Sequence, residues 1–271
     1  MDGVESLVTL EKLELYDNHI EEVRGVDLLS NLRILDISFN SIRCMVPLAH
    51  CCPMLEELYM AQNKLRKIEG LDGLKNLVTL DLGANRIRVI EGLETTVNLR
   101  SLCLGKNKIE AVAGLENLLN LRQLDIQNNR LLSLYSASSH DTTTGDTAAA
   151  TASSGLAHLS KLEELYLAWN GISSLSGGLP SSIQILDLTN NRLKSFEEEI
   201  LNLTNLEEFW CSSNLIESFD DIKLLSQLQK LTCLYLEHNP VAKMAETTCQ
   251  EYRAQLKLLI PSLTQIDALL V

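Results

Sequence analysis

The chain has 271 residues, of which 45% are hydrophobic and only 4% are aromatic, and its net charge is −13 at pH 7. The pI near 4.9 disfavours nucleic acid as a partner, because phosphates are bound by clusters of Lys and Arg. It equally disfavours an anionic membrane surface. Another protein is therefore the expected partner.

The first residues contain no basic segment followed by an apolar run, so we expect no signal peptide. No apolar stretch reaches the ~18 residues of a membrane span. The seven cysteines are odd in number and form no CxxC pair, which favours reduced thiols and a location in the nucleus and cytoplasm. Without ligand spacing, neither a metal site nor a cofactor is expected.

The pattern Leu-x-x-Leu-x-Leu-x-x-Asn-x-Leu recurs ten times along the chain. Successive asparagines are separated by 22, 23, 22, 22, 22, 41, 21, 23 and 25 residues. A period in this range with this motif is typical of a leucine-rich-repeat solenoid, in which short rungs stack on one another. The asparagines are Asn18, Asn40, Asn63, Asn85, Asn107, Asn129, Asn170, Asn191, Asn214 and Asn239.

One repeat illustrates the expected structure. Leu80 and Leu82 alternate with polar or small residues, which predicts a short strand with both leucines facing inward. Ile87 and Leu99 belong to the segment that returns behind the sheet and fills the same core. We therefore expect an α/β solenoid with a curved parallel sheet on the concave face and short helical, 3-10 or irregular segments on the convex side. The repeated Asn saturates backbone groups at each turn.

The long spacing between Asn129 and Asn170 reflects an insertion at 136–154, which contains no aliphatic residue larger than Ala. Such a composition cannot bury enough apolar surface to offset its ordering entropy, so a flexible loop is expected. We assign residues 1–240 to a solenoid of about ten repeats. Residues 241–271, with a helix expected from Ala245 to Ile260, form a C-terminal cap that covers the last rung.

The concave face is the expected functional surface, because a stack of short rungs encloses no pocket. Trp210 lies between two inward positions, so strand parity directs its ring outward, and the same holds for the tyrosines of the ladder. Exposed aromatic residues among carboxylates are typical of protein interfaces. The outward positions are Glu14, Asp36, Tyr59, Asp81, Cys103, Asp125, Tyr166, Asp187, Trp210 and Tyr235.

Catalysis is disfavoured by the same geometry. Asp81 and Asp125 are expected two rungs apart, ~10 Å, on an open sheet. A catalytic acid or base requires a pocket that perturbs its pKa. The five histidines lie in turns or in the insertion, and no glycine-rich phosphate loop is present.

Several runs carry a more specific resemblance. LYDNHI, LDISFNSIR, LDLGANRIRVIEGLE, LGKNKI, LEELYLAWNGI and LEEFWCSSNLIES resemble the leucine-rich-repeat regulatory subunits of protein phosphatase 1 (the regulatory subunit 7 family). The ending LYLEHNPVAK and YRAQLKLLIPSLTQID resembles the last repeat and cap of that family. The resemblance covers the chain outside the insertion, and it places the first residue about two repeats after the start of family members.

The resemblance implies a non-catalytic regulatory subunit whose concave face binds the catalytic subunit of protein phosphatase 1 and controls its maturation, activity or targeting. A monomer is expected outside that complex. Cys103 departs from the family, which has an aromatic residue there. The contact residues that the resemblance implies are Asp36, Tyr59, Asp81, Asp187, Glu208, Trp210 and Tyr235.

Two other classes of function stay open at this point. A ciliary or cytoskeletal leucine-rich-repeat scaffold shares the repeat and is disfavoured only by the EEFW segment and the cap. An enzyme of unknown class ranks last, because the repeats offer no enclosed site.

Overall fold

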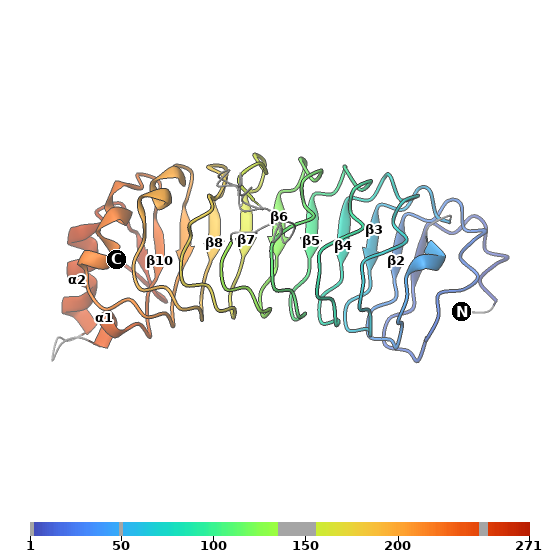
Figure 1. Ribbon diagram of the computed structural model, residues 1–271, viewed down its shortest axis with the longest axis horizontal. Helices are drawn as coiled ribbons and strands as arrows, with labels where there is room; N and C mark the ends of the chain where they lie inside the picture. Colours follow the sequence, from blue (N-terminus) through green and yellow to red (C-terminus); the bar gives the residue numbers. More distant parts are fainter. Residues whose placement is uncertain (1–2, 49–50, 135–155, 244–248) are drawn as a thin grey trace, which may run out of the picture.

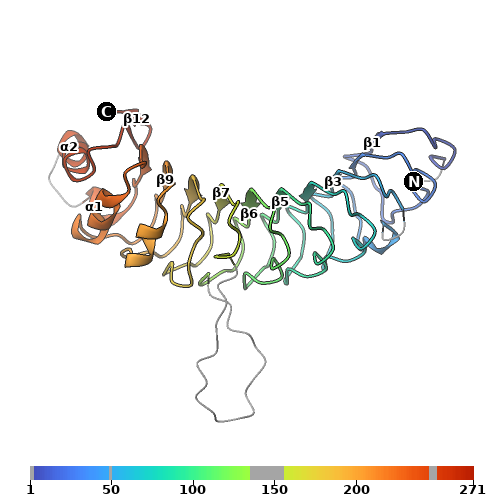
Figure 2. The same cartoon turned by 90° about the horizontal axis from the view of Figure 1, so that it is seen from above.

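The computed structural model of the chain describes residues 3–48, 51–134, 156–243 and 249–271. The described residues form an elongated arc, and Figures 1 and 2 show strands along its concave side and returning segments along its convex side. The predicted leucine-rich-repeat solenoid is confirmed. The insertion predicted at 136–154 lies outside the described residues, and so does the start of the helix predicted from Ala245.

Within the described residues, twelve strands form one sheet in sequence order. All neighbouring pairs from β1 to β11 are parallel, and β12 is antiparallel to β11. The strands are β1 (Lys12–Glu14), β2 (Ile34–Asp36), β3 (Glu57–Tyr59), β4 (Thr79–Asp81), β5 (Ser101–Cys103), β6 (Gln123–Asp125), β7 (Glu164–Tyr166), β8 (Ile185–Asp187), β9 (Glu208–Trp210), β10 (Cys233–Tyr235), β11 (Gln265–Ile266) and β12 (Leu269–Leu270).

The core is a continuous stack of aliphatic side chains behind this sheet. In the repeat of β4, Leu80, Leu82, Ile87 and Leu99 are all fully buried. Each strand places its central residue inward, and the next inward residue follows directly after the strand. Burial of each such side chain contributes roughly 1.5–3 kcal/mol, so adjacent rungs hold each other in place.

The motif asparagines link the rungs. Nδ2 of Asn85 donates to the carbonyls of Met60, Leu82 and Gly83 at 2.9, 3.0 and 3.2 Å, while its Oδ1 accepts the Leu65 N–H at 3.0 Å. The Met60 and Leu65 bonds both reach the preceding rung. One buried amide thus satisfies four backbone groups, as the structural interpretation of this residue predicted.

A left-handed residue precedes each of these asparagines. Ala84 has φ 53°, and Trp169 has φ 57° at the same position of the seventh repeat. This conformation costs an L-residue roughly 1–2 kcal/mol. The backbone N–H compensates in part, because that of Trp169 donates to the carbonyl of Thr189 in the next rung at 2.8 Å.

The return segments are largely irregular, with short 3-10 helices η1 (Val46–Leu48), η2 (Glu198–Asn202) and η3 (Asp220–Gln227). The helices α1 (Pro240–Lys243) and α2 (Cys249–Leu259) follow β10 and stand at one end of the arc (Figure 1). Tyr252 and Leu256 of α2 are buried in the common core, and the ring of Tyr252 lies 6.3 Å from that of Phe219. Because β11 continues the sheet, the cap and the repeats share one set of strands. None of the helices in the described ranges is long and apolar enough to cross a membrane.

The sheet is continuous across the point of the insertion. Strand β6 pairs directly with β7, and Leu124 is in register with Leu165, although 41 residues separate them along the chain. The extra residues therefore do not interrupt the stack of rungs.

Candidate protein-binding face

The predicted outward positions form one line across the concave sheet. The pairing register connects Asp36, Tyr59 and Asp81 directly, and it continues without a gap through β10. Side chains on this line lie one rung, ~4.8 Å, apart. Carboxylates prevail along this line up to Asp125, with Tyr59 among them, and aromatic rings prevail from Tyr166 to Tyr235.

Strand parity is as predicted at the aromatic positions. Phe209 and Cys211, which flank Trp210, are fully buried, whereas Trp210 itself is only half-buried and lies on the concave side. Of the seven predicted contact residues, six are partly exposed: Asp36, Tyr59, Asp81, Glu208, Trp210 and Tyr235. Asp187 is different, because only 8% of it is exposed.

Trp210 is the centre of an aromatic cluster that extends from β7 to β10. Its ring lies 6.3 Å from that of Tyr166 and 6.0 Å from that of Tyr235, the latter in an edge-to-face arrangement at 72°. Such pairs contribute roughly 0.5–1.5 kcal/mol beyond the area they bury. The cluster is therefore a rigid apolar platform on an otherwise polar sheet.

The cluster explains the burial of Asp187. This residue lies between β7 and β9 in the ladder, so the approaching rings of Tyr166 and Trp210 bracket it on both sides. Burial raises the pKa of Asp187, although hydrogen bonds from Thr189 oppose the rise. Asp187 is therefore a mostly buried carboxylate beneath the platform rather than a solvated residue of the face.

The indole N–H of Trp210 is buried and has no hydrogen-bond acceptor within the described residues. An unsatisfied buried donor is costly, by ~1–3 kcal/mol. The ring thus retains one unpaired polar group beneath the surface of the platform.

The aspartates of the ladder also have a structural role that sequence reasoning missed. Oδ1 of Asp81 accepts the N–H of Gly83 at 2.8 Å, and Asp36, Asp125 and Asp187 make the same bond to the residue two positions later. Each carboxylate therefore fixes the turn that follows its own strand, and Oδ2 of Asp125 also accepts a hydrogen bond from Gln127 Nε2 at 3.0 Å. The recurrent Asp-x-[small or polar] spacing was the available signal.

Two tyrosines are oriented by glutamates on their own strands. The Tyr59 hydroxyl donates to Glu57 Oε2 at 2.8 Å, and the Tyr166 hydroxyl donates to Glu164 Oε2 at 3.0 Å. Burial, followed by this bond to a carboxylate, raises the pKa of each tyrosine to about 12. Both hydroxyls stay protonated at physiological pH and hold the rings in a fixed direction.

Cys103 occupies the gap left by the missing aromatic residue. Its thiol donates to Asp125 Oδ2 at 3.6 Å, and burial together with Asp81 and Asp125 raises the pKa of that thiol. The thiol is therefore protonated at neutral pH, and among the described residues the ring-to-ring contacts on the face are those of Trp210 with Tyr166 and Tyr235.

Tyr235 connects the face to the cap, because its hydroxyl accepts a hydrogen bond from Gln265 Nε2 of β11 at 2.8 Å. In the described part of the chain, no group of three or more His, Cys, Asp or Glu residues is arranged to hold a metal ion. The concave face therefore has the features of a protein-binding surface, with an apolar platform at one end and carboxylates along its length.

Comparison with known proteins is consistent with this geometry. Residues 53–95 and 181–224 match the family described as "Leucine Rich repeats (2 copies)". The chain has the leucine-rich-repeat fold. Its relatives include the protein phosphatase 1 regulatory inhibitor subunit PPP1R7 homolog of Arabidopsis thaliana, which is 38% identical over 85 residues, or 31% of this chain and 26% of that protein.

Of two further relatives, one is named as a regulatory subunit of the same phosphatase and the other as a microtubule-associated protein. The protein phosphatase 1 regulatory subunit SDS22 of Schizosaccharomyces pombe is 41% identical over 73 residues, which cover 27% of this chain and 21% of that protein. The 187-kDa microtubule-associated protein AIR9 of Arabidopsis thaliana is 33% identical over 86 residues, covering 31% of this chain and 5% of that protein. The matched part spans about a quarter or less of each relative's length. The resemblance to the phosphatase regulatory family is confirmed over these segments.

Among solved structures, the Leptospira interrogans leucine-rich-repeat protein LIC12759 superposes with a TM-score of 0.67 at 23% identity. The superposition covers 97% of this chain and 68% of the Leptospira protein. At this identity the likeness concerns the fold alone.

Proposed function

We propose that the chain is a non-catalytic regulatory subunit that binds the catalytic subunit of protein phosphatase 1 through the concave face. The observation that carries the proposal is the platform of Tyr166, Trp210 and Tyr235, which presents large rings on an open, acidic sheet. Relatives named as regulatory subunits of this phosphatase support the choice of partner.

The aromatic rings and the carboxylates of the face have different roles in this proposal. The platform supplies the central apolar contact, where replacement of one anchor typically costs ~2 kcal/mol or more of binding. The carboxylates of Asp36, Asp81 and Glu208 steer and orient a basic patch of the phosphatase. Ten rungs span ~45 Å along the arc, which matches the width of a whole globular domain.

The cellular role follows from the same assignment. The chain controls the maturation, activity or targeting of the phosphatase, and it is a monomer outside that complex. Its site of action is the nucleus and cytoplasm, for which the reduced state expected of its cysteines is the supporting observation.

The test is a binding measurement with the double variant Trp210→Ala and Glu208→Ala. We expect the affinity for the purified phosphatase catalytic subunit to fall about 30-fold or more, which corresponds to ~2 kcal/mol. The matched control, Leu132→Ala with Glu110→Ala, removes one exposed apolar side chain and one carboxylate from the return segments.

The control is expected to bind the phosphatase as the unaltered chain does. Far-UV circular dichroism must show that both double variants are folded. A folded Trp210 and Glu208 variant that retains full affinity would contradict the assignment of these residues, and unaltered chain that does not bind the phosphatase would contradict the proposed function itself.

A second candidate is a cytoskeletal scaffold, for which the similarity to the microtubule-associated protein is the specific observation. Sedimentation with polymerised microtubules separates the two candidates. Co-sedimentation that the Trp210 and Glu208 variant does not reduce, without binding to the phosphatase, would favour the scaffold.

A further inference from the structure

A basic strip follows the outer edge of the solenoid, in contrast to the net charge of −13. Its residues belong to the segments that come directly after strands β2 to β6. They account for eight of the 23 Lys and Arg residues of the chain, within fewer than 90 residues of sequence. The strip consists of Arg43, Lys64, Arg66, Lys67, Arg86, Arg88, Lys108 and Arg130.

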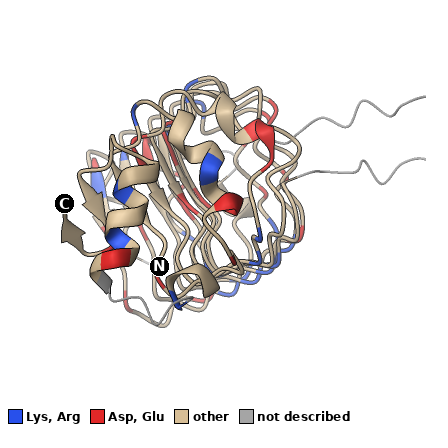
Figure 3. Ribbon diagram, turned by 90° about the vertical axis from the view of Figure 1, so that its left-hand side faces the viewer, with Lys and Arg blue, Asp and Glu red and all other residues tan. Residues whose placement is uncertain are grey.

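The strip results from the repeat register. Lys64, Arg86, Lys108 and Arg130 each follow a motif asparagine, whereas Arg43, Arg66 and Arg88 come three residues after one. Because equivalent positions stack at ~4.8 Å per rung, these side chains form two parallel columns. Figure 3, which looks along the arc, shows Lys and Arg segments gathered along one edge of the stacked coils.

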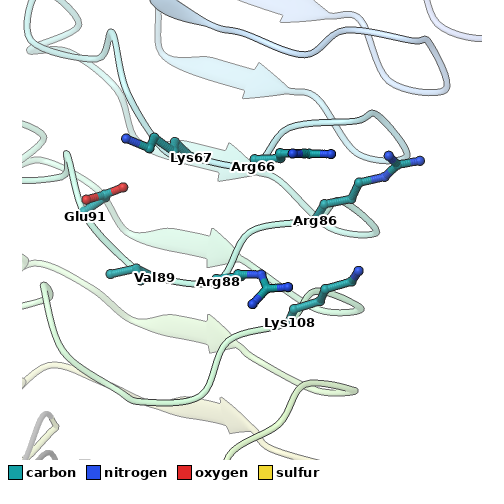
Figure 4. Close-up of a pocket in the computed structure, with 7 residues that line it drawn as sticks. All are labelled: Arg66, Lys67, Arg86, Arg88, Val89, Glu91 and Lys108. Atoms are coloured by element: carbon teal, nitrogen blue, oxygen red, sulfur yellow. The ribbon is translucent and has the colours of Figure 1, made fainter.

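The two columns enclose a pocket of about 570 Å³ that lies away from the concave face. Figure 4 shows Arg66, Arg86, Arg88 and Lys108 on successive segments, with their charged ends directed to the same side. Val89, which is 57% exposed, adds an apolar side chain to the lining of the pocket.

The charges of the strip are poorly compensated. Arg66, Arg86 and Arg88 are exposed and form no ion pair with any carboxylate of the described residues. Arg130, at the end of the strip, pairs with Glu110 at 3.6 Å. Like charges on neighbouring rungs repel each other, so an anionic partner would relieve this repulsion.

The size of the strip indicates what kind of anion fits. From Arg43 to Arg130 it spans four rung steps, about 19 Å, which is the length of about six residues of extended polypeptide. A longer polyanion such as nucleic acid would extend past Arg43 onto Glu21 and Glu22, which line a pocket together with Arg43, and would be repelled by them.

We propose that this strip binds an acidic segment of a partner polypeptide, at a site separate from the concave face. Carboxylates of the segment pair with the two arginine columns, and an apolar residue packs on Val89. Glu91, which lines the same pocket, opposes the anion and limits the site on that side.

The test uses the full chain and a fluorescein-labelled decaglutamate peptide, with binding followed by fluorescence anisotropy at low salt. The triple variant Arg66→Ala, Arg86→Ala and Arg88→Ala is expected to bind about tenfold more weakly, because each exposed pair contributes modestly. Glu91→Lys is expected to bind about threefold more tightly, because it replaces an opposing charge with an attractive one. A gain of affinity cannot result from misfolding.

The matched control is Arg192→Ala, Lys194→Ala and Lys223→Ala. It removes the same number of exposed charges, and Arg192 and Lys194 occupy the two strip positions in a repeat outside the strip. Retained peptide affinity in this control supports a local site. Equal losses in both triple variants would overturn the proposal, because binding would then depend only on overall charge.

Competition identifies the class of ligand. Decaglutamate must be displaced by an unlabelled acidic peptide more effectively than by inorganic phosphate or by a single-stranded DNA of ten nucleotides. Stronger competition by the DNA would overturn the proposal in favour of nucleic acid. Stronger competition by phosphate would overturn it in favour of a site for small anions.

Discussion

Asn107 provides a quantitative test of the role of the motif asparagine. Its Nδ2 donates to the carbonyls of Leu82, Leu104 and Gly105 at 3.0, 3.0 and 3.3 Å, and its Oδ1 accepts the Ile87 N–H at 3.0 Å. In Asn107→Ala, the three carbonyls keep another donor, which is provided by Asn85, Asn129 and the Ala84 N–H, respectively.

The Ile87 N–H is the group that loses its acceptor in this variant. An orphaned buried donor costs ~1–3 kcal/mol, and the weakened carbonyl bonds add ~1 kcal/mol. We therefore expect Asn107→Ala to lower the free energy of unfolding by about 2–4 kcal/mol. Urea denaturation followed by far-UV circular dichroism measures this difference.

Asn18→Ala is the matched control, because Asn18 holds the same motif position in an exposed turn. Its Nδ2 donates only to the carbonyls of Leu15 and Tyr16, at 3.1 and 3.0 Å. These bonds are local and solvated, so their loss should cost less than ~1 kcal/mol. Equal effects of the two substitutions would refute the argument that cross-rung hydrogen bonding makes this residue necessary.

Two further substitutions test the turns and the buried acid. Gly114→Ala should lower the free energy of unfolding by more than ~2 kcal/mol, because φ is +77° and a Cβ would lie 2.2 Å from the Ile90 carbonyl oxygen. Gly171→Ala is the control, because the atom nearest to its Cβ belongs to a movable side chain. An equal loss of stability in both variants would contradict the argument that the backbone at Gly114 requires glycine. Asp187→Asn should stabilise the fold at pH 7, since the amide oxygen still accepts the Thr189 N–H without a buried charge. Because the pKa of Asp187 is raised in the folded state, the unaltered chain loses stability as pH rises from the unfolded-state pKa of ~3.9. The advantage of the Asn variant should therefore vanish below about pH 3 in urea titrations. A stability difference that does not change with pH would refute this reasoning.

The backbone of the solenoid could be predicted because each repeat has the same spacing of leucines and asparagine. Period-2 alternation fixed the inward direction of Leu80 and the outward direction of Trp210, and both are observed. The number of rungs and the need for a C-terminal cap followed from the asparagine spacing and from the exposed edge of a last strand. Register between neighbours then leaves little freedom, because one face must be apolar.

The details of the candidate face were less accessible to sequence reasoning. The ring of Trp210 approaches that of Tyr166 across an intervening strand, and this depends on side-chain rotamers rather than on strand parity. The burial of Asp187 follows from that contact, so parity alone predicted it to be exposed. The phosphatase contacts of these residues stay a prediction.

The basic strip could have been found by aligning the repeats on their asparagines. Positions one and three residues after Asn63 and Asn85 are Lys or Arg in both repeats. The net charge of −13 does not reveal this local pattern, because a sum over the chain does not record where the positive charges lie. A position-by-position comparison of repeats is therefore more informative than composition for solenoids.

The direct pairing of β6 with β7 has a practical consequence for anyone who engineers this chain. The link between these two strands can vary in length without shifting the ladder, so it is a natural place to graft a fluorescent protein or an affinity handle. Such a graft would permit single-molecule observation of encounters at the hollow of the arc and at its positively charged rim.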